Sequence, residues 1–100
     1  MENNTIGTYM PSEEEMRATF DSYISRIYSI LVNYEATKKI NKEFVNFLCF
    51  EIQSYAHIIG NDKLLILPSK LIGLLVDDIQ YSYVRKIVLD STNYLTRLKG

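Results

Sequence analysis

The sequence predicts an all-α fold, a compact bundle of about four helices. Glycine and proline are scarce, with 4 Gly and 2 Pro in 100 residues, so few turns are marked. Apolar residues recur at steps of three and four along four segments, which is the spacing of one helix face. Hydrophobic residues make up 47% and charged residues 23% of the chain, as in ordinary globular proteins. We expect a flexible N-terminal tail at 1–10 and a single helical domain at 11–100.

The first helix is expected at 13–35. Ser12 can accept a hydrogen bond from the amide of Glu15, and the Glu15 side chain can reach back to Ser12, which is a capping box. Glu13, Glu14 and Glu15 also lie at the positive end of the helix dipole. The apolar positions with helical spacing are Met16, Phe20, Tyr23, Ile24, Ile27, Leu31 and Tyr34.

The second helix is expected at 42–59, because Asn41 is a favourable N-cap and Gly60 a favourable stop. A broad apolar face holds Phe44, Val45, Leu48, Cys49, Ile52, Tyr55, Ala56 and Ile59. The opposite strip holds Glu43, Asn46, Phe50, Gln53, Ser54 and His57, with Phe47 and Ile58 on the border. Phe50 is thus an aromatic ring with polar neighbours. Either it anchors a partner, or the N-terminal tail or the 61–67 segment covers it.

Two further helices are expected at 68–80 and 83–98. Pro68 suits the first turn of the third helix, and residues 62–67 form either a short helical turn or an extended crossing. Gly73 lowers helix propensity but permits a close helix crossing. Their apolar sets are Leu71, Ile72, Leu74, Leu75, Val76 and Ile79, then Val84, Ile87, Val88, Ser91, Tyr94, Leu95 and Leu98.

The last two helices are either separate, with Ser82 as N-cap of the fourth, or continuous. A continuous helix of about 30 residues would be about 45 Å long. Such a length is unusual in so small a domain, so four helices are favoured.

Motifs for catalysis or metal binding are missing from the sequence. Cys49 and His57 are the single residues of their kinds and fall on different helix faces, and neither ExxH nor CxxC occurs. No glycine-rich phosphate loop is present. Neighbouring carboxylates such as Asp77 and Asp78 point about 100° apart on a helix. We therefore expect no catalytic residue, no cofactor and no metal, and predict that the protein is not an enzyme.

Nucleic-acid and membrane binding are also disfavoured. The formal net charge is −1, without the basic surplus that neutralises phosphates. The fourth predicted helix offers Arg85, Lys86, Arg97 and Lys99 but also Asp90, so a small nucleic-acid-binding regulator or antitoxin stays as an alternative. No stretch approaches the ~20 apolar residues that span a bilayer. The N-terminus does not resemble a secretory signal, and a single cysteine suits a reducing compartment. We expect a cytoplasmic protein.

A protein-binding surface is the remaining possibility. Tyrosine occurs 8 times, and Tyr23, Tyr34, Tyr55 and Tyr94 are expected in the core. Other tyrosines lie close to acidic residues, and aromatic rings beside acids suit a basic protein partner. The candidate partner-binding residues are Glu13, Glu14, Asn46, Phe50, Gln53, His57, Asp77, Asp78, Tyr81 and Tyr83.

In type, the chain resembles the small all-helical immunity proteins of bacteria. The resemblance rests on its size, helical pattern, lack of catalytic groups, tyrosine-rich surface and the acids at Glu13 to Glu15 and Asp77–Asp78. It implies a tight complex with a toxin, such as a bacteriocin or a contact-dependent-inhibition nuclease, whose substrate site the protein blocks. Acidic side chains would then occupy positions meant for phosphate, and the partner would be a basic toxin domain. The other alternative is a structural homo-oligomer, with Phe50 and the exposed tyrosines buried between copies.

Overall fold

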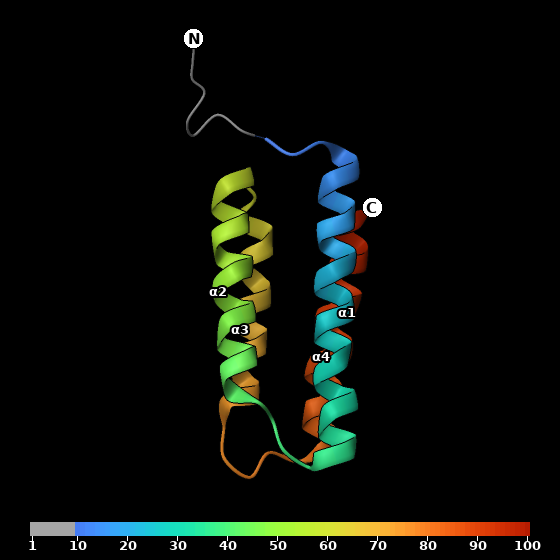
Figure 1. The fold of residues 1–100 in the computed structure, drawn as a ribbon, viewed down its shortest axis with the longest axis vertical. Helices are drawn as coiled ribbons and strands as arrows, with labels where there is room; N and C mark the ends of the chain where they lie inside the picture. The colour runs from blue at the N-terminus through green and yellow to red at the C-terminus, as the bar shows by residue number, and fades with distance from the viewer. Residues whose placement is uncertain (1–9) are drawn as a thin grey trace.

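The computed structural model describes residues 10–100, which fold into four antiparallel α-helices without a strand (Figure 1). The helices are α1 (Glu13–Thr37), α2 (Lys42–Ile59), α3 (Ile66–Leu71) and α4 (Tyr81–Lys99). Two 3₁₀ turns, η1 (Asp62–Leu65) and η2 (Ile72–Leu75), flank α3. The all-α prediction is confirmed. The predicted N-terminal tail falls almost wholly on residues 1–9, which lie outside the described part of the chain.

Helix α1 begins at the predicted capping box. The Oγ atom of Ser12 accepts a hydrogen bond from the Glu15 amide at 3.1 Å, and the Glu15 carboxylate accepts one from the Ser12 amide at 2.8 Å. The helix runs two residues past the predicted end. It stops where Lys38 adopts a left-handed conformation with a φ of 63° and donates its amide to the Tyr34 carbonyl at 2.7 Å.

Helix α2 has the bounds that its caps predict. The Asn41 side chain accepts a hydrogen bond from the Phe44 amide at 3.1 Å. Gly60 has a φ of 65°, and its amide donates to the His57 carbonyl at 3.3 Å. Because glycine has no Cβ, it adopts this left-handed conformation without steric cost.

The third helix differs from its predicted range of 68–80 at both ends. Residues 62–67 are helical, because η1 and the first residues of α3 occupy them, and Pro68 lies in the first turn of α3. The helical path ends at Leu75, after which Val76 is extended and Asp78 has a φ of 56°. The third and fourth helices are therefore separate, and a continuous rod is excluded.

Contacts from α1 and α2 hold the turn between η2 and α4. The Tyr34 hydroxyl donates to the Ile79 carbonyl at 2.8 Å, and the Lys42 ammonium lies 2.8 Å from an Asp77 carboxylate oxygen. Gln80 is the N-cap of α4, and its side chain makes no capping hydrogen bond within residues 10–100. The prediction of Ser82 as N-cap is wrong, since these tertiary contacts end the turn earlier and Ser82 lies inside α4.

Gly73 permits close packing of η2 against α4. A Cβ atom at this position would lie 3.1 Å from Cδ1 of Ile87 and 3.5 Å from the Tyr83 hydroxyl. Real Cβ contacts are seldom so short, so the close crossing expected at Gly73 is confirmed.

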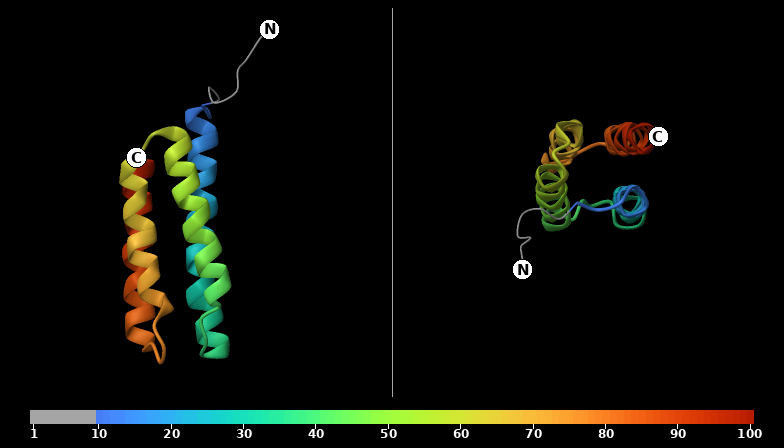
Figure 2. Two further views of the ribbon diagram at one scale, coloured as in Figure 1. Left: turned by 90° about the vertical axis from the view of Figure 1, so that its left-hand side faces the viewer. Right: turned by 90° about the horizontal axis from the view of Figure 1, so that it is seen from above.

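The core runs along the centre of the bundle. Helices α1 and α4 pack as one pair, and α2 packs with α3 as the other (Figure 2). The buried apolar side chains are Phe20, Tyr23, Ile27, Ile30, Tyr34, Val45, Leu48, Cys49, Ile52, Ala56, Leu64, Leu67, Leu71, Leu74, Val84, Ile87, Val88 and Leu95. Tyr55 and Tyr94 pack against this core and are half-buried. None of the helices in residues 10–100 is long and apolar enough to cross a membrane.

An ion pair links α1 to α2 across the two helix pairs. Both terminal guanidinium nitrogens of Arg26, Nη1 and Nη2, donate to the Glu51 carboxylate at 2.8 Å. Next to it the rings of Tyr23 and Tyr55 meet edge to face, with centroids 6.1 Å apart. Burial, with the negative charge of Glu51 adding to it, raises the pKa of Tyr23 to about 12. These contacts fix the rotation of α2 relative to α1.

Candidate protein-docking site

Helix α2 carries large apolar side chains on two opposite sides. On its inner side Val45, Leu48 and Ile52 are fully buried. On its outer side Phe47 is 63% exposed and Phe50 is 66% exposed. The two phenylalanines are three residues apart, so they are neighbours on the helix surface. Of the two predicted covers for Phe50, the 61–67 segment leaves it mostly exposed, and the N-terminal tail lies almost wholly outside the described residues.

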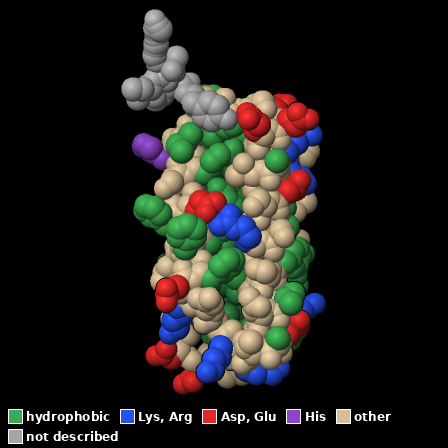
Figure 3. Space-filling model, viewed as in Figure 1, with side chains coloured by type: hydrophobic (Ala, Val, Ile, Leu, Met, Phe, Trp, Pro, Cys, Tyr) green, Lys and Arg blue, Asp and Glu red, His purple; other side chains and the backbone are tan. Residues whose placement is uncertain are grey.

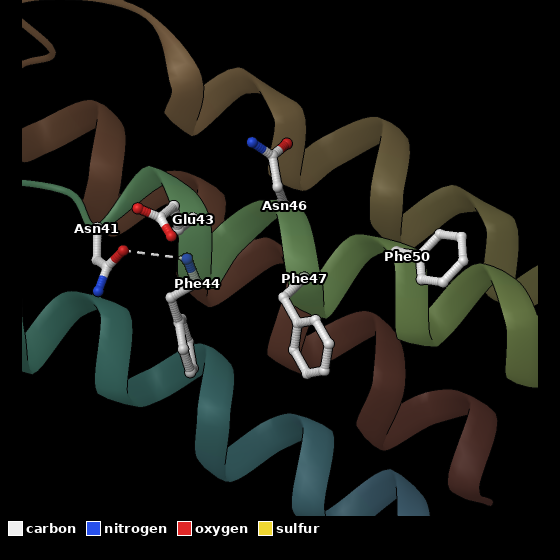
Figure 4. Close-up of a pocket in the computed structure, with 6 residues that line it drawn as sticks. All are labelled: Asn41, Glu43, Phe44, Asn46, Phe47 and Phe50. Atoms are coloured by element: carbon white, nitrogen blue, oxygen red, sulfur yellow. Dashed lines mark hydrogen bonds between the residues drawn. The ribbon is translucent and has the colours of Figure 1, made fainter.

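An open hollow lies beside these two rings. Its lining residues are Asn41, Glu43, Phe44, Asn46, Phe47 and Phe50 (Figure 4). Figure 4 shows Phe44 and Phe47 pointing to the side of α2 on which α1 lies, while Phe50 projects farther along the helix. The Asn41 side chain is occupied by its cap hydrogen bond. Glu43 and Asn46 make no side-chain hydrogen bond or ion pair within residues 10–100, so both are available to a partner.

A second hollow lies on the other side of Phe50, between α2 and α3. Its lining residues are Gln53, Leu65, Pro68, Ser69 and Ile72. Leu65 is 44% exposed and Ile72 is 55% exposed. The two helices are close here, because the Cys49 thiol lies 4.0 Å from the Pro68 carbonyl oxygen. The left view of Figure 2 turns this side of the molecule toward the reader.

We call the surface around both hollows the docking face. It consists of Phe47, Phe50, Leu65 and Ile72, with the polar residues Glu43, Asn46 and Gln53. In the space-filling view, hydrophobic side chains protrude at the edge of the molecule that α2 forms (Figure 3). A cluster of exposed apolar side chains with polar neighbours is typical of protein interaction sites.

Some of the predicted partner-binding residues meet on this surface. Asn46 and Phe50 share the first hollow, and Gln53 lines the second. His57 lies in the last turn of α2 and is exposed as well. All four side chains therefore point away from the core along one strip of α2, as the helical pattern predicts.

The predicted acidic residues do not gather at one place. Glu13 and Glu14 are in the first turn of α1, whereas Asp77 and Asp78 lie in the turn before α4, at the opposite end of the bundle (Figure 1). One partner site cannot contact both groups unless it extends along the whole bundle. Asp77 also accepts a hydrogen bond from Lys42 within the chain, and this hydrogen bond lowers the pKa of its carboxyl group.

The two exposed tyrosines of α4 face different neighbours. The Tyr81 hydroxyl donates to a Glu35 carboxylate oxygen at 2.9 Å, and this hydrogen bond raises the pKa of Tyr81. The Tyr81 ring also stacks on Tyr34, with centroids 6.4 Å apart. Tyr83 instead lines a hollow with Gly73 on the side of α3 and η2. Tyr81 thus lies away from the docking face, whereas the hollow that Tyr83 lines shares Ser69 with the second hollow of the docking face.

The pattern alone did not identify Phe47, Leu65 and Ile72. Phe47 fell on the border of the polar strip, but its spacing of three residues from Phe50 is a usable signal of a shared surface. Ile72 was predicted with the apolar set of the third helix, and Val76 with it, yet they are 55% and 49% exposed. Ile72 begins a 3₁₀ turn, whose three residues per turn rotate side chains away from their α-helical positions.

Among residues 10–100, no three His, Cys, Asp or Glu side chains lie close enough together to hold a metal ion. Cys49 is buried, and this burial raises the pKa of its thiol. No family model matches the sequence, and comparisons with curated proteins and with solved structures find no match either. The geometry of the docking face therefore carries the functional argument.

Proposed function

We propose that this chain is a non-enzymatic protein-binding module that contacts its partner through the docking face. The observation that carries the proposal is the pair Phe47 and Phe50, which lie side by side and mostly exposed on the outer side of α2. Moving one such ring out of water contributes on the order of 1.5–3 kcal/mol. Two adjacent rings thus supply a strong apolar anchor at the centre of an interface.

The polar residues around the rings indicate the chemistry of the partner. Glu43 contributes a carboxylate without an ion pair in the described chain, and Asn46 and Gln53 contribute amide groups. Buried amides and carboxylates need hydrogen-bond partners, so the opposing surface should present donors to them. A partner with basic side chains opposite Glu43 meets this requirement, and charge complementarity also speeds association.

The docking face is held on a rigid element. Both ends of α2 are capped, its inner side is buried, and the Arg26–Glu51 pair joins it to α1. A surface that is ordered before binding loses little conformational entropy when the complex forms. Such a surface is suited to high affinity.

The more specific proposal is that of an immunity protein, which neutralises a cognate bacterial toxin by covering its active site. Its support is the resemblance in size and helical pattern, together with an exposed aromatic anchor on a rigid helix. In a nuclease, the Glu43 carboxylate would take a place meant for a substrate phosphate. The acids at Asp77 and Asp78 lie at one end of the bundle and are not part of this contact.

The nucleic-acid alternative has less support. Two of the four basic residues of α4 that it needs are engaged in ion pairs: Lys86 with Asp90 at 3.0 Å and Lys99 with Asp21 at 2.6 Å. Arg85 and Arg97 alone would neutralise few phosphates, so a salt-dependent affinity for duplex DNA is not expected.

The test first asks whether a basic toxin-like domain is encoded next to this chain, and then uses that domain as the probe. Titration calorimetry should give tight binding to the wild type and a loss of about 2 kcal/mol or more for the double variant Phe47→Ala, Phe50→Ala. The matched control is Val32→Ala, because Val32 is 62% exposed on α1, outside the docking face. Equal affinity of the wild type and the double variant would contradict the proposed docking face, and no binding at all would contradict the toxin partner.

A further inference from the structure

On the outer strip of α2, side chains that can hydrogen-bond to one another stand at equal distances before and after Phe50. Glu43 stands seven residues before Phe50, and His57 stands seven residues after it. Asn46 stands four residues before it, and Ser54 four after. Seven residues are close to two helical turns, so Glu43, Phe50 and His57 follow one line along the helix surface. These residues are exposed, and those of the strip that are polar make no side-chain hydrogen bond within residues 10–100.

We propose that a second copy of this chain docks on the docking face, with the two α2 helices antiparallel and a two-fold axis at Phe50. In such a pair, each residue faces the one equally far from Phe50 on the opposite side. Phe50 would pack on its own counterpart, and Asn46 would face Ser54 of the second copy. Glu43 would face His57 of the second copy, so that its carboxylate accepts a hydrogen bond from the imidazole. Two-fold symmetry makes each of these unlike contacts occur twice.

Repulsion between the two Glu43 carboxylates disfavours the parallel orientation. A parallel pair would set Glu43 against Glu43, and like charges facing each other disfavour association. The antiparallel pair instead sets the carboxylate against a hydrogen-bond donor. It leaves Phe50 at the centre, with Phe47 opposite Gln53 of the second copy. Exposed Leu65 and Ile72 beside the helix extend the apolar contact. Helices α2 and α3 together form one side of the molecule, so neither of the other two helices of residues 10–100 lies in front of them (Figure 2).

Self-association goes beyond the proposed function and competes with it. The second copy covers the residues that a heterologous partner would contact. We expect a partner to convert the dimer into a one-to-one complex, so its apparent affinity should weaken as the concentration of this chain rises.

The experiment is sedimentation of the full chain over a range of concentrations. The wild type and Val32→Ala should sediment as dimers, whereas Phe50→Glu should be monomeric because it sets two carboxylates against each other on the two-fold axis. Circular dichroism should show the same helix content for all three, because both substituted side chains are exposed. A wild type that is monomeric at every concentration, or a dimer that survives Phe50→Glu, would overturn the inference.

A charge exchange tests the antiparallel register. The single variants Glu43→His and His57→Glu should each weaken the dimer by about tenfold. The first removes the carboxylate that accepts the hydrogen bond, and the second sets carboxylates opposite one another. The double variant, which exchanges the two residues, should recover most of that loss. A double variant as weak as the single ones would overturn the register. A monomeric wild type that still binds a basic toxin domain would refute self-association while the proposed function stands.

Discussion

Helix α2 carries large apolar side chains on both of its sides, but the rest of the bundle buries only those on the inner side. On the inner side Val45, Leu48 and Ile52 are fully buried, and on the outer side Phe47 and Phe50 are left mostly in water. Both sides belong to one capped helix with one backbone geometry. Within residues 10–100, the inner stripe packs in the core and the outer phenylalanines do not, so we expect the two sides to differ in what they contribute to stability.

The largest expected effect is on the inner side. Ile52→Ala should lower the free energy of unfolding by about 2–5 kcal/mol, because it removes a fully buried side chain and leaves a cavity. Urea unfolding followed by circular dichroism measures the loss. A loss below about 1 kcal/mol would mean that the bundle collapses around the site, and the contrast with the outer side would weaken.

A smaller effect is expected on the flank of α2, where Glu51 meets Arg26. The hydrogen bonds from Arg26 lower the pKa of Glu51, so the pair stabilises the fold when Glu51 is ionised. At neutral pH, Glu51→Gln should cost up to about 1 kcal/mol, since both side chains are partly exposed and water screens the pair. Because the folded-state pKa is below the unfolded one, this stabilisation is lost as pH falls through the folded-state pKa.

Urea unfolding of the wild type and Glu51→Gln at neutral and acidic pH measures that difference. The wild type and the variant should converge in acid, where Glu51 is protonated. In an Arg26→Met background the same substitution should show little dependence on pH. A gap that stays constant from neutral to acidic pH would rule out the ion pair as its cause.

The smallest effect on stability is expected at the outer side. Phe50→Ala should change the free energy of unfolding by less than about 0.5 kcal/mol when measured in dilute protein, where a second copy is dissociated. Its effect on partner affinity should exceed its effect on stability. A loss of several kcal/mol in the same urea assay would show that the ring is covered within the folded chain, and the docking face would have to be abandoned.

Sequence patterns identified the first two helices well because their signals are local. Ser12 with Glu15, Asn41 and Gly60 act within one turn of the residues they cap. The third helix was harder to predict. Its end depends on the Tyr34–Ile79 hydrogen bond and the Lys42–Asp77 ion pair, which join residues far apart in the chain.

The candidate site divides in the same way. The polar strip on α2 and the position of Phe50 on it followed from helical periodicity. Helical periodicity did not predict that Leu65 and Ile72 belong to the docking face. Their exposure there depends on the 3₁₀ geometry around α3 and on how α3 packs against α2. The predicted acidic residues do not share one site, also because of the tertiary fold. The antiparallel path of the chain puts Glu13 and Asp77 at opposite ends of the bundle.

The sequence by itself determined where α1 and α2 form, how they are capped and which stripe of each is buried. These properties arise from hydrogen bonds and side-chain spacing over three or four residues. The tertiary structure alone decided which of the remaining apolar side chains stay exposed to water and where the turn between η2 and α4 ends. The burial of a side chain by another helix, and contacts between residues far apart in the chain, depend on how whole helices pack. Helix packing in turn depends on residues throughout the chain.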